Sequence, residues 1–232
     1  MKKLIVSAML ATSLFVAPAA FATMGTGMDP VVALADLMDG NKGFAKSGDV
    51  STLNKMSTVK NRVALAAGQN PEAIIVTCSD SRLSPEILFD KGLGQVFVIR
   101  VAGNIVAPHE LGSIEYAVEH LGTRLIMVLG HSACGAVGAA YGAADPATGI
   151  IPEAALEGNI GSLIKDIAPA VEESYFAGKE ACIVTNVHNV VDQMENQSEI
   201  VREGLDSGLV KVVAAKYDLT SGKVSLLEEA HH

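Results

Sequence analysis

Three short, uninterrupted apolar runs constrain the fold of this chain more than any other feature. They cover Ala73 to Thr77, Gln95 to Val101 and Arg124 to Leu129. Continuous apolar runs of this length are typical of parallel strands that are buried on both faces. Helical patterns alternate with these runs along the chain. We therefore predict an α/β fold with a mainly parallel central sheet flanked by helices.

Helical periodicity first occurs before any predicted strand. It runs from Asp29 to Ala45, with Asp29 placed as the N-cap and Pro30 at the first helical position, so it predicts an N-terminal helical arm. Further helices are predicted over Glu110 to Leu121, Cys134 to Tyr141, Glu153 to Phe176 and Lys179 to Glu203.

The C-terminal part of the chain has the pattern of a hairpin. Leu209 to Tyr217 and Val224 to Leu227 read as strands on either side of the turn Thr220-Ser221-Gly222. The last strand is then an antiparallel edge strand. Together with the three apolar runs, this pattern predicts four strands plus an edge strand.

Composition indicates one globular domain and argues against a nucleic-acid partner. The chain has 232 residues, of which 49% are hydrophobic and 19% charged. That balance excludes a disordered chain. The formal net charge is -9, and the basic residues form no stripe that could follow a phosphate backbone.

The first 22 residues have the pattern of a secretory signal peptide. Two lysines precede an apolar run from Leu4 to Val16, and the segment ends in Ala20-Phe21-Ala22. A retained membrane anchor is the alternative, but the run is shorter than the ~20 residues that a spanning helix needs. We predict cleavage after Ala22, a single domain over residues 23–232, and a periplasmic protein with no membrane association after cleavage.

Export makes the three cysteines informative, because an oxidising compartment favours disulfides and an odd number cannot all pair within one chain. Cys182 lies in an apolar helical pattern, which indicates a small buried side chain. Cys78 and Cys134 follow the first and third apolar runs. Burial in a helix does not explain these two cysteines.

Polar side chains gather where two neighbouring strands are predicted to end. The first strand is followed by Cys78-Ser79-Asp80-Ser81-Arg82 and the third by Gly130-His131-Ser132-Ala133-Cys134-Gly135. Ligands of open α/β sheets bind at the carboxyl ends of strands. Two thiols and one imidazole suit Zn²⁺, and three protein ligands leave one tetrahedral position open, as in catalytic sites. We predict one Zn²⁺ per chain, held by Cys78, His131 and Cys134.

Asp80 and Arg82 alternate with Cys78 along an extended strand end. Their side chains are therefore expected on the same side as the first ligand. A carboxylate beside a metal can accept a hydrogen bond from bound water, and a guanidinium can hold that carboxylate in place. A bare surface ion pair is the simpler alternative.

These two segments resemble the signatures of the β-class carbonic anhydrases. The resemblance extends over nearly the whole chain after the signal peptide. It includes Ser84-Pro85-Glu86, Gly92-Leu93-Gly94, Val98-Ile99-Arg100-Val101-Ala102-Gly103-Asn104, Gly112-Ser113-Ile114-Glu115-Tyr116-Ala117 and Asn186-Val187. The resemblance implies reversible hydration of carbon dioxide to bicarbonate and a proton by zinc-bound hydroxide, with Asp80 and Arg82 as catalytic residues.

The same resemblance implies a substrate cleft and an oligomer. Residues matching the family's cleft are Gln69, Phe97, Ala102, Tyr116 and Gly135. In the family, the clefts form between protomers, and the neighbour of the zinc-bearing chain supplies the residues matching Gln69, Phe97 and Tyr116. A homodimer or homotetramer is therefore expected.

Three other functions are alternatives. A hydrolase of carbonyl sulfide or carbon disulfide would use the same scaffold and the same hydroxide addition. A catalytically silent zinc-binding homologue would be expected to lack Asp80 or Arg82, and both are present. A thiol oxidoreductase suits the compartment, but the chain has no C-x-x-C motif and that function leaves Asp80, Arg82 and His131 without a role.

Overall fold

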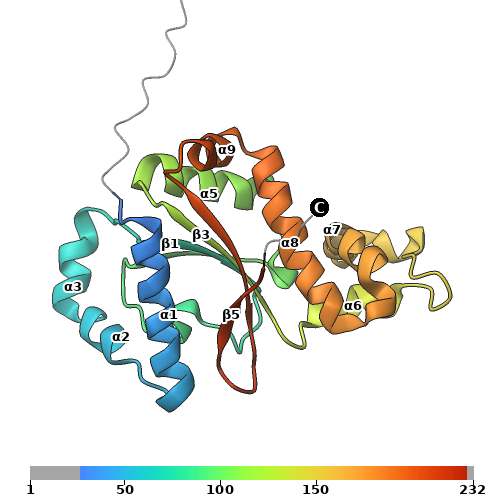
Figure 1. The fold of residues 1–232 in the computed structure, drawn as a ribbon, viewed down its shortest axis with the longest axis horizontal. Coiled ribbons are helices and arrows are strands. Elements are labelled where there is room, and N and C mark those ends of the chain that lie inside the picture. Colours follow the sequence, from blue (N-terminus) through green and yellow to red (C-terminus); the bar gives the residue numbers. More distant parts are fainter. Residues whose placement is uncertain (1–26, 229–232) are drawn as a thin grey trace, which may run out of the picture.

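The fold is an α/β sheet with helices on both faces (Figure 1), seen in a computed structural model that describes residues 27–228. The strands are β1 (Ala73–Thr77), β2 (Val96–Arg100), β3 (Leu125–His131), β4 (Lys211–Tyr217) and β5 (Val224–Leu226). They form one five-stranded sheet in the order β2-β1-β3-β4-β5. The α-helices are α1 (Pro30–Ser47), α2 (Ser51–Met56), α3 (Val59–Ala64), α4 (Pro85–Leu88), α5 (Pro108–Leu121), α6 (Gly135–Ala143), α7 (Gly158–Ser174), α8 (Lys179–Gln197) and α9 (Glu199–Asp206).

The predicted sheet is confirmed. β1 pairs with β2 and with β3, and β3 pairs with β4, all in parallel, whereas β5 pairs antiparallel with β4. β3 is longer than the predicted strand, because its pairing with β4 continues through Gly130 and His131. His131 is therefore the last residue of a strand rather than part of the loop beyond it.

The N-terminal helix begins as predicted. The Asp29 side chain accepts hydrogen bonds from the backbone N–H groups of Val31 and Val32, and Pro30 occupies the first turn. Gly48 ends the helix in the left-handed conformation, with φ of 68°.

Two long helices were predicted too long. The segment from Glu153 to Phe176 is interrupted by Gly158, whose φ of 72° is left-handed, and α7 begins there. The segment from Lys179 to Glu203 breaks at Ser198, whose side chain caps α9 by accepting from the Val201 N–H. The short helices α2, α3 and α4 were not predicted.

Alternate residues of the buried strands point to opposite faces of the sheet and join two separate apolar cores. Ile74 and Val76 of β1 pack in the core that includes residues of α5, α8 and α9. Ala73 and Ile75 pack in the other core with Leu37 of α1. This two-fold alternation explains why the apolar runs are continuous rather than alternating.

A third apolar cluster covers the carboxyl ends of β1 and β3. Residues of α6, α7 and α8 contribute to it, including Val137, Ile167 and Ile183, and it also contains Cys78 and Cys134. In Figure 1, α6 and α7 lie together on one side of the molecule, whereas α2 and α3 lie on the other. Cys182 is buried in this cluster, as predicted.

A buried ion-pair group attaches α1 to the sheet. Lys91, which is 3% exposed, forms ion pairs with Glu72 just before β1 and with Asp36 of α1. The Lys91 Nζ to Glu72 Oε1 distance is 2.7 Å. The Lys91–Glu72 pair is almost fully buried, since the Glu72 side chain is 7% exposed.

The predicted signal peptide at residues 1–22 and the terminal residues His231 and His232 lie outside the described part of the chain. Between residues 27 and 228, none of the helices has the length and apolar character required for a membrane span.

Candidate metal centre

The parallel pairing of β1 with β3 brings the two signature segments together. Thr77, the last residue of β1, stands opposite Leu129, and its Oγ1 donates a hydrogen bond of 2.8 Å to the Leu129 carbonyl. Cys78 follows directly, while His131 ends β3 and Cys134 directly precedes α6. All three side chains therefore reach the same edge of the sheet.

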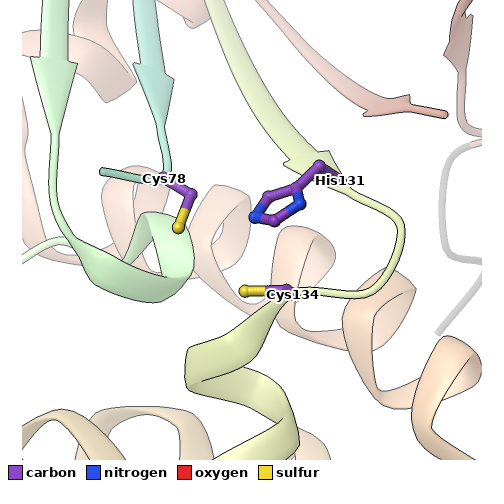
Figure 2. A group of neighbouring side chains, drawn as sticks. All are labelled: Cys78, His131 and Cys134. Carbon is purple, nitrogen blue, oxygen red and sulfur yellow. The ribbon is translucent and has the colours of Figure 1, made fainter. Parts of the chain in front are cut away.

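Cys78, His131 and Cys134 converge on one point (Figure 2). Their ligand atoms, the two Sγ atoms and one imidazole nitrogen, all lie within 4.8 Å of one another. All three residues are buried, with 4%, 0% and 2% of their surfaces exposed. The structure thus assembles the predicted ligand set from two separate segments of the chain.

Hydrogen bonding fixes the tautomer of His131. Its Nδ1 lies 3.0 Å from the Ser132 carbonyl oxygen, which only accepts hydrogen bonds, so Nδ1 carries the proton. The Nε2 atom then presents a lone pair. This atom is buried and has no hydrogen-bond partner among the described residues, which is costly unless a ligand occupies the position.

The two thiols shift each other's pKa in opposite directions. The neighbouring Cys134 thiol lowers the pKa of Cys78, and the same interaction raises the pKa of Cys134, with burial adding to the increase. The Gly103 backbone N–H also donates to Cys78 Sγ at 3.3 Å. These contacts favour the thiolate of Cys78, the form that binds a metal, and a cation between the two sulfurs favours loss of both thiol protons.

These observations fit Zn²⁺. Two sulfurs and one imidazole nitrogen are ligands that zinc prefers, and the donor atoms lie close enough to share one ion. Three protein ligands are also the number found in catalytic rather than structural zinc sites.

Asp80 and Arg82 lie beside this cluster and contact each other. The Arg82 Nε and Nη2 atoms donate to Asp80 Oδ1 and Oδ2 at 2.9 and 2.6 Å. These bonds hold the pKa of Asp80 well below its usual range. The Asp80 side chain is 15% exposed and that of Arg82 54% exposed. The predicted pair is thus formed, while its catalytic role stays a prediction.

The predicted cleft residues divide into two groups. Ala102 adjoins Gly103, whose N–H contacts Cys78 Sγ, and Gly135 follows Cys134 and faces open space. Both therefore lie next to the metal cluster. Gln69 lies elsewhere, in a hollow with Leu65 and Leu93 that contains none of the three ligands.

Phe97 and Tyr116 form a separate pair. Phe97 is in β2, an edge strand of the sheet, and its ring centroid is 6.5 Å from that of Tyr116 in α5. Tyr116 is 48% exposed. Within one chain, the structure does not bring Gln69, Phe97 and Tyr116 together with the metal ligands.

Sequence reasoning missed the groups that support the ligand segments. Arg100 donates to the carbonyls of Cys78 and Asp80 at 3.2 and 2.7 Å, and Asn186 donates to the Gly103 carbonyl at 2.8 Å. The motif containing Arg100 and the pair Asn186-Val187 were recognised, but nothing in their local pattern indicates these distant partners.

Comparisons with known proteins agree with this site. A family model described as "Carbonic anhydrase" matches residues 73–224. The carbonic anhydrase of Mycolicibacterium smegmatis is 36% identical over 206 residues, which cover 85% of this chain and 93% of that protein.

Solved structures share the fold. The β-carbonic anhydrase CafA of Aspergillus fumigatus is 26% identical, with a TM-score of 0.64, and the match covers 87% of this chain and 92% of that one. A structure from a study of two tetrameric β-carbonic anhydrases of Sordaria macrospora has a TM-score of 0.62 at 23% identity, covering 85% and 94%. By its sequence match, its fold and its ligand cluster, this chain belongs to the β-carbonic anhydrase family.

Proposed function

We propose that the protein catalyses the reversible hydration of carbon dioxide to bicarbonate and a proton at a zinc centre formed by Cys78, His131 and Cys134. The observation that carries the proposal is the buried ligand cluster, in which His131 Nε2 has no protein partner among the described residues. The adjoining Asp80–Arg82 pair supplies a carboxylate that a purely structural metal site does not need.

Bound Zn²⁺ supplies a Lewis acid that makes water acidic enough to serve as a nucleophile near neutral pH. The remaining chemistry falls to the residues of the chain. Because hydrogen bonds from Arg82 keep Asp80 ionised, the Asp80 carboxylate accepts a hydrogen bond from the attacking oxygen and orients it. The guanidinium of Arg82 donates two hydrogen bonds to the carboxylate and so limits its rotation.

The substrate is small and nonpolar, and the surroundings of the cluster suit it. The apolar residues packed around Cys78 and Cys134 include Ile105 and Ile167. Ala102 and Gly135 add only small groups beside the ligands. A nonpolar molecule can approach here without loss of strong hydrogen bonds to water.

We also propose that the active unit is a homo-oligomer. Gln69 precedes β1 and Cys78 follows it, so the two residues lie at opposite ends of the same strand. Contacts of the intervening segment agree: the Glu72 N–H donates to the Gln95 carbonyl, just before β2 begins. Gln69 can act on substrate only if a second copy of the chain supplies it. The relatives from Sordaria macrospora are tetrameric by their description.

Export to the periplasm is a further part of the proposal and rests on the pattern of residues 1–22. The test is mass spectrometry of the protein purified from a periplasmic extract. A mature N-terminus at Thr23 supports export. An uncleaved protein confined to the cytosol contradicts it.

Stopped-flow hydration of carbon dioxide, with zinc quantified in the same sample, tests the activity. We expect rapid turnover by the zinc-loaded protein. Carbonyl sulfide and carbon disulfide are measured in parallel, because they are linear molecules open to the same attack. Rapid hydrolysis of either without carbon dioxide hydration would replace the proposed substrate.

A further inference from the structure

The short connection between two of the ligands contains an unusual backbone conformation. Ala133, between His131 and Cys134, has φ of 54°, in the left-handed region that residues with a Cβ atom rarely adopt. This conformation turns the chain from β3 into α6. It persists only where surrounding contacts hold the loop.

Ser132 is held by the end of β4 and by the segment that follows it. Its backbone N–H donates to the Tyr217 carbonyl at 2.9 Å, and its Oγ accepts from the Leu219 N–H at 3.0 Å. Ala133 is held by a side chain instead. Its N–H donates to Oε1 of Glu180 at 2.9 Å, from a residue 47 positions away in the sequence.

Glu180 is itself fixed from a second direction. It lies in the first turn of α8, where the helix dipole favours a negative charge. Its Oε2 accepts from Lys216 Nζ at 2.5 Å, and Lys216 stands opposite Gly130 in the pairing of β4 with β3. Burial raises the pKa of Glu180, but the bonds from Lys216 and Ala133 outweigh it and lower the pKa overall.

We propose that Glu180 is a positioning residue for the metal centre, which holds Ala133 in its left-handed conformation and thereby directs His131 and Cys134 at the same point. The hydrogen bonds of Glu180 go to the Ala133 N–H and to Lys216 Nζ, and not to the side chain of either metal ligand. Its effect passes through the backbone of the loop. The inference rests on the proposed zinc centre, but it is tested by metal binding and can fail while hydration activity is confirmed.

The first test compares Glu180→Ala with Glu199→Ala. Glu199 is also an acidic residue in the first turn of a helix and pairs with Arg202, so it is a matched control. Zinc affinity is measured by competition with a chelator. We expect Glu180→Ala to lose about 10- to 100-fold in affinity, the usual effect of removing a group that orients a ligand. Glu199→Ala should bind like the wild type.

Cobalt(II) substitution reports the geometry of the site directly. The visible spectrum of the cobalt protein should change in Glu180→Ala and stay unchanged in Glu199→Ala. Circular dichroism confirms that each variant is folded. Wild-type zinc affinity and spectrum in Glu180→Ala, or equal losses in both variants, would overturn the inference.

Two further variants separate positioning from general support. Glu180→Gln keeps a carbonyl acceptor for the Ala133 N–H and should retain most of the zinc affinity. Ala133→Gly removes the conformational penalty, because glycine adopts positive φ freely. In that background Glu180→Ala should cost less affinity than in the wild type. An equal cost in both backgrounds, or a loss in Glu180→Gln as large as in Glu180→Ala, would refute the proposed role.

Discussion

Arg82 donates three hydrogen bonds to the carboxylate of Asp80, one from its backbone N–H and two from its guanidinium. The carboxylate is thus fixed in direction and kept ionised two residues beyond the ligand Cys78. We expect Asp80→Asn to keep its zinc and to lose about 10²- to 10⁴-fold in turnover, because it lacks the charged acceptor. Metal analysis and stopped-flow hydration measure the two effects separately.

Asp49→Asn is the matched control for this variant. Asp49 Oδ1 accepts from the Ser51 N–H, two residues on, as Asp80 Oδ1 accepts from the Arg82 N–H. Asp49 lies just before α2 and belongs to neither ligand segment. The turnover of Asp49→Asn should therefore equal that of the wild type. Arg82→Ala should resemble Asp80→Asn. Full turnover in either site variant would exclude the catalytic pair, and loss of zinc would assign the residue to support of the metal.

Mixing of inactive variants tests whether a second copy supplies Gln69. Gln69→Ala should lower turnover by about 10²- to 10³-fold, as loss of a positioned donor does, and Cys78→Ala should lose its metal. If Gln69 acts on the neighbouring chain, a mixed oligomer contains a complete site. Coexpression of the two variants should then restore activity in about a quarter of the sites for random dimers.

Cys78→Ala coexpressed with Asp80→Asn is the control for this experiment. Both residues serve the same site of one chain, so no mixture of these two variants can produce a complete site. If coexpression of Gln69→Ala with Cys78→Ala does not restore activity, Gln69 acts within its own chain or has no role in catalysis.

Lys91→Met should destabilise the fold strongly. Lys91 is the partner of the buried Glu72, and its removal leaves that carboxylate without a countercharge. Breaking a buried pair in this way typically costs about 3–5 kcal/mol. Denaturant unfolding measures the change, with Lys60→Met as the control, because Lys60 is exposed and should alter stability by less than about 0.5 kcal/mol.

The cost of Lys91→Met should also depend on pH. Burial raises the pKa of Glu72 even with Lys91 present, so the folded protein binds this proton more tightly than the unfolded chain does. The free energy of unfolding therefore falls as pH rises from about 4.3, the ordinary glutamate value, through the raised pKa. Without Lys91 this fall should be larger. A destabilisation equal at pH 5 and pH 7 would contradict the argument.

Burial explains why the sheet could be predicted and several helix ends could not. β1 matches its predicted range because all of its residues are buried and none interrupts the apolar run. The break at Ser198 depends instead on a tertiary contact: its Oγ donates to Glu115 Oε1 at 2.7 Å while capping α9. The helical periodicity around Ser198 gives no indication of this contact, because Glu115 is 83 positions away in the sequence.

The same contrast holds for the site. Cys78, His131 and Cys134 could be identified because their residue types and their places after the strands are local properties. The groups that hold them in position come from distant elements, as Glu180 does for Ala133 and Asn186 for Gly103. These contacts form only when α8 packs against the ends of the strands, so the local sequence does not reveal them.

Zinc titration of the metal-free protein, followed by carbon dioxide hydration, tests the central claim most directly. Cys78, His131 and Cys134 form one zinc site in each chain. Turnover should therefore rise linearly with added zinc and level off at one equivalent per chain. Turnover that is independent of zinc, or that saturates at the same level in Cys78→Ala, would contradict the account.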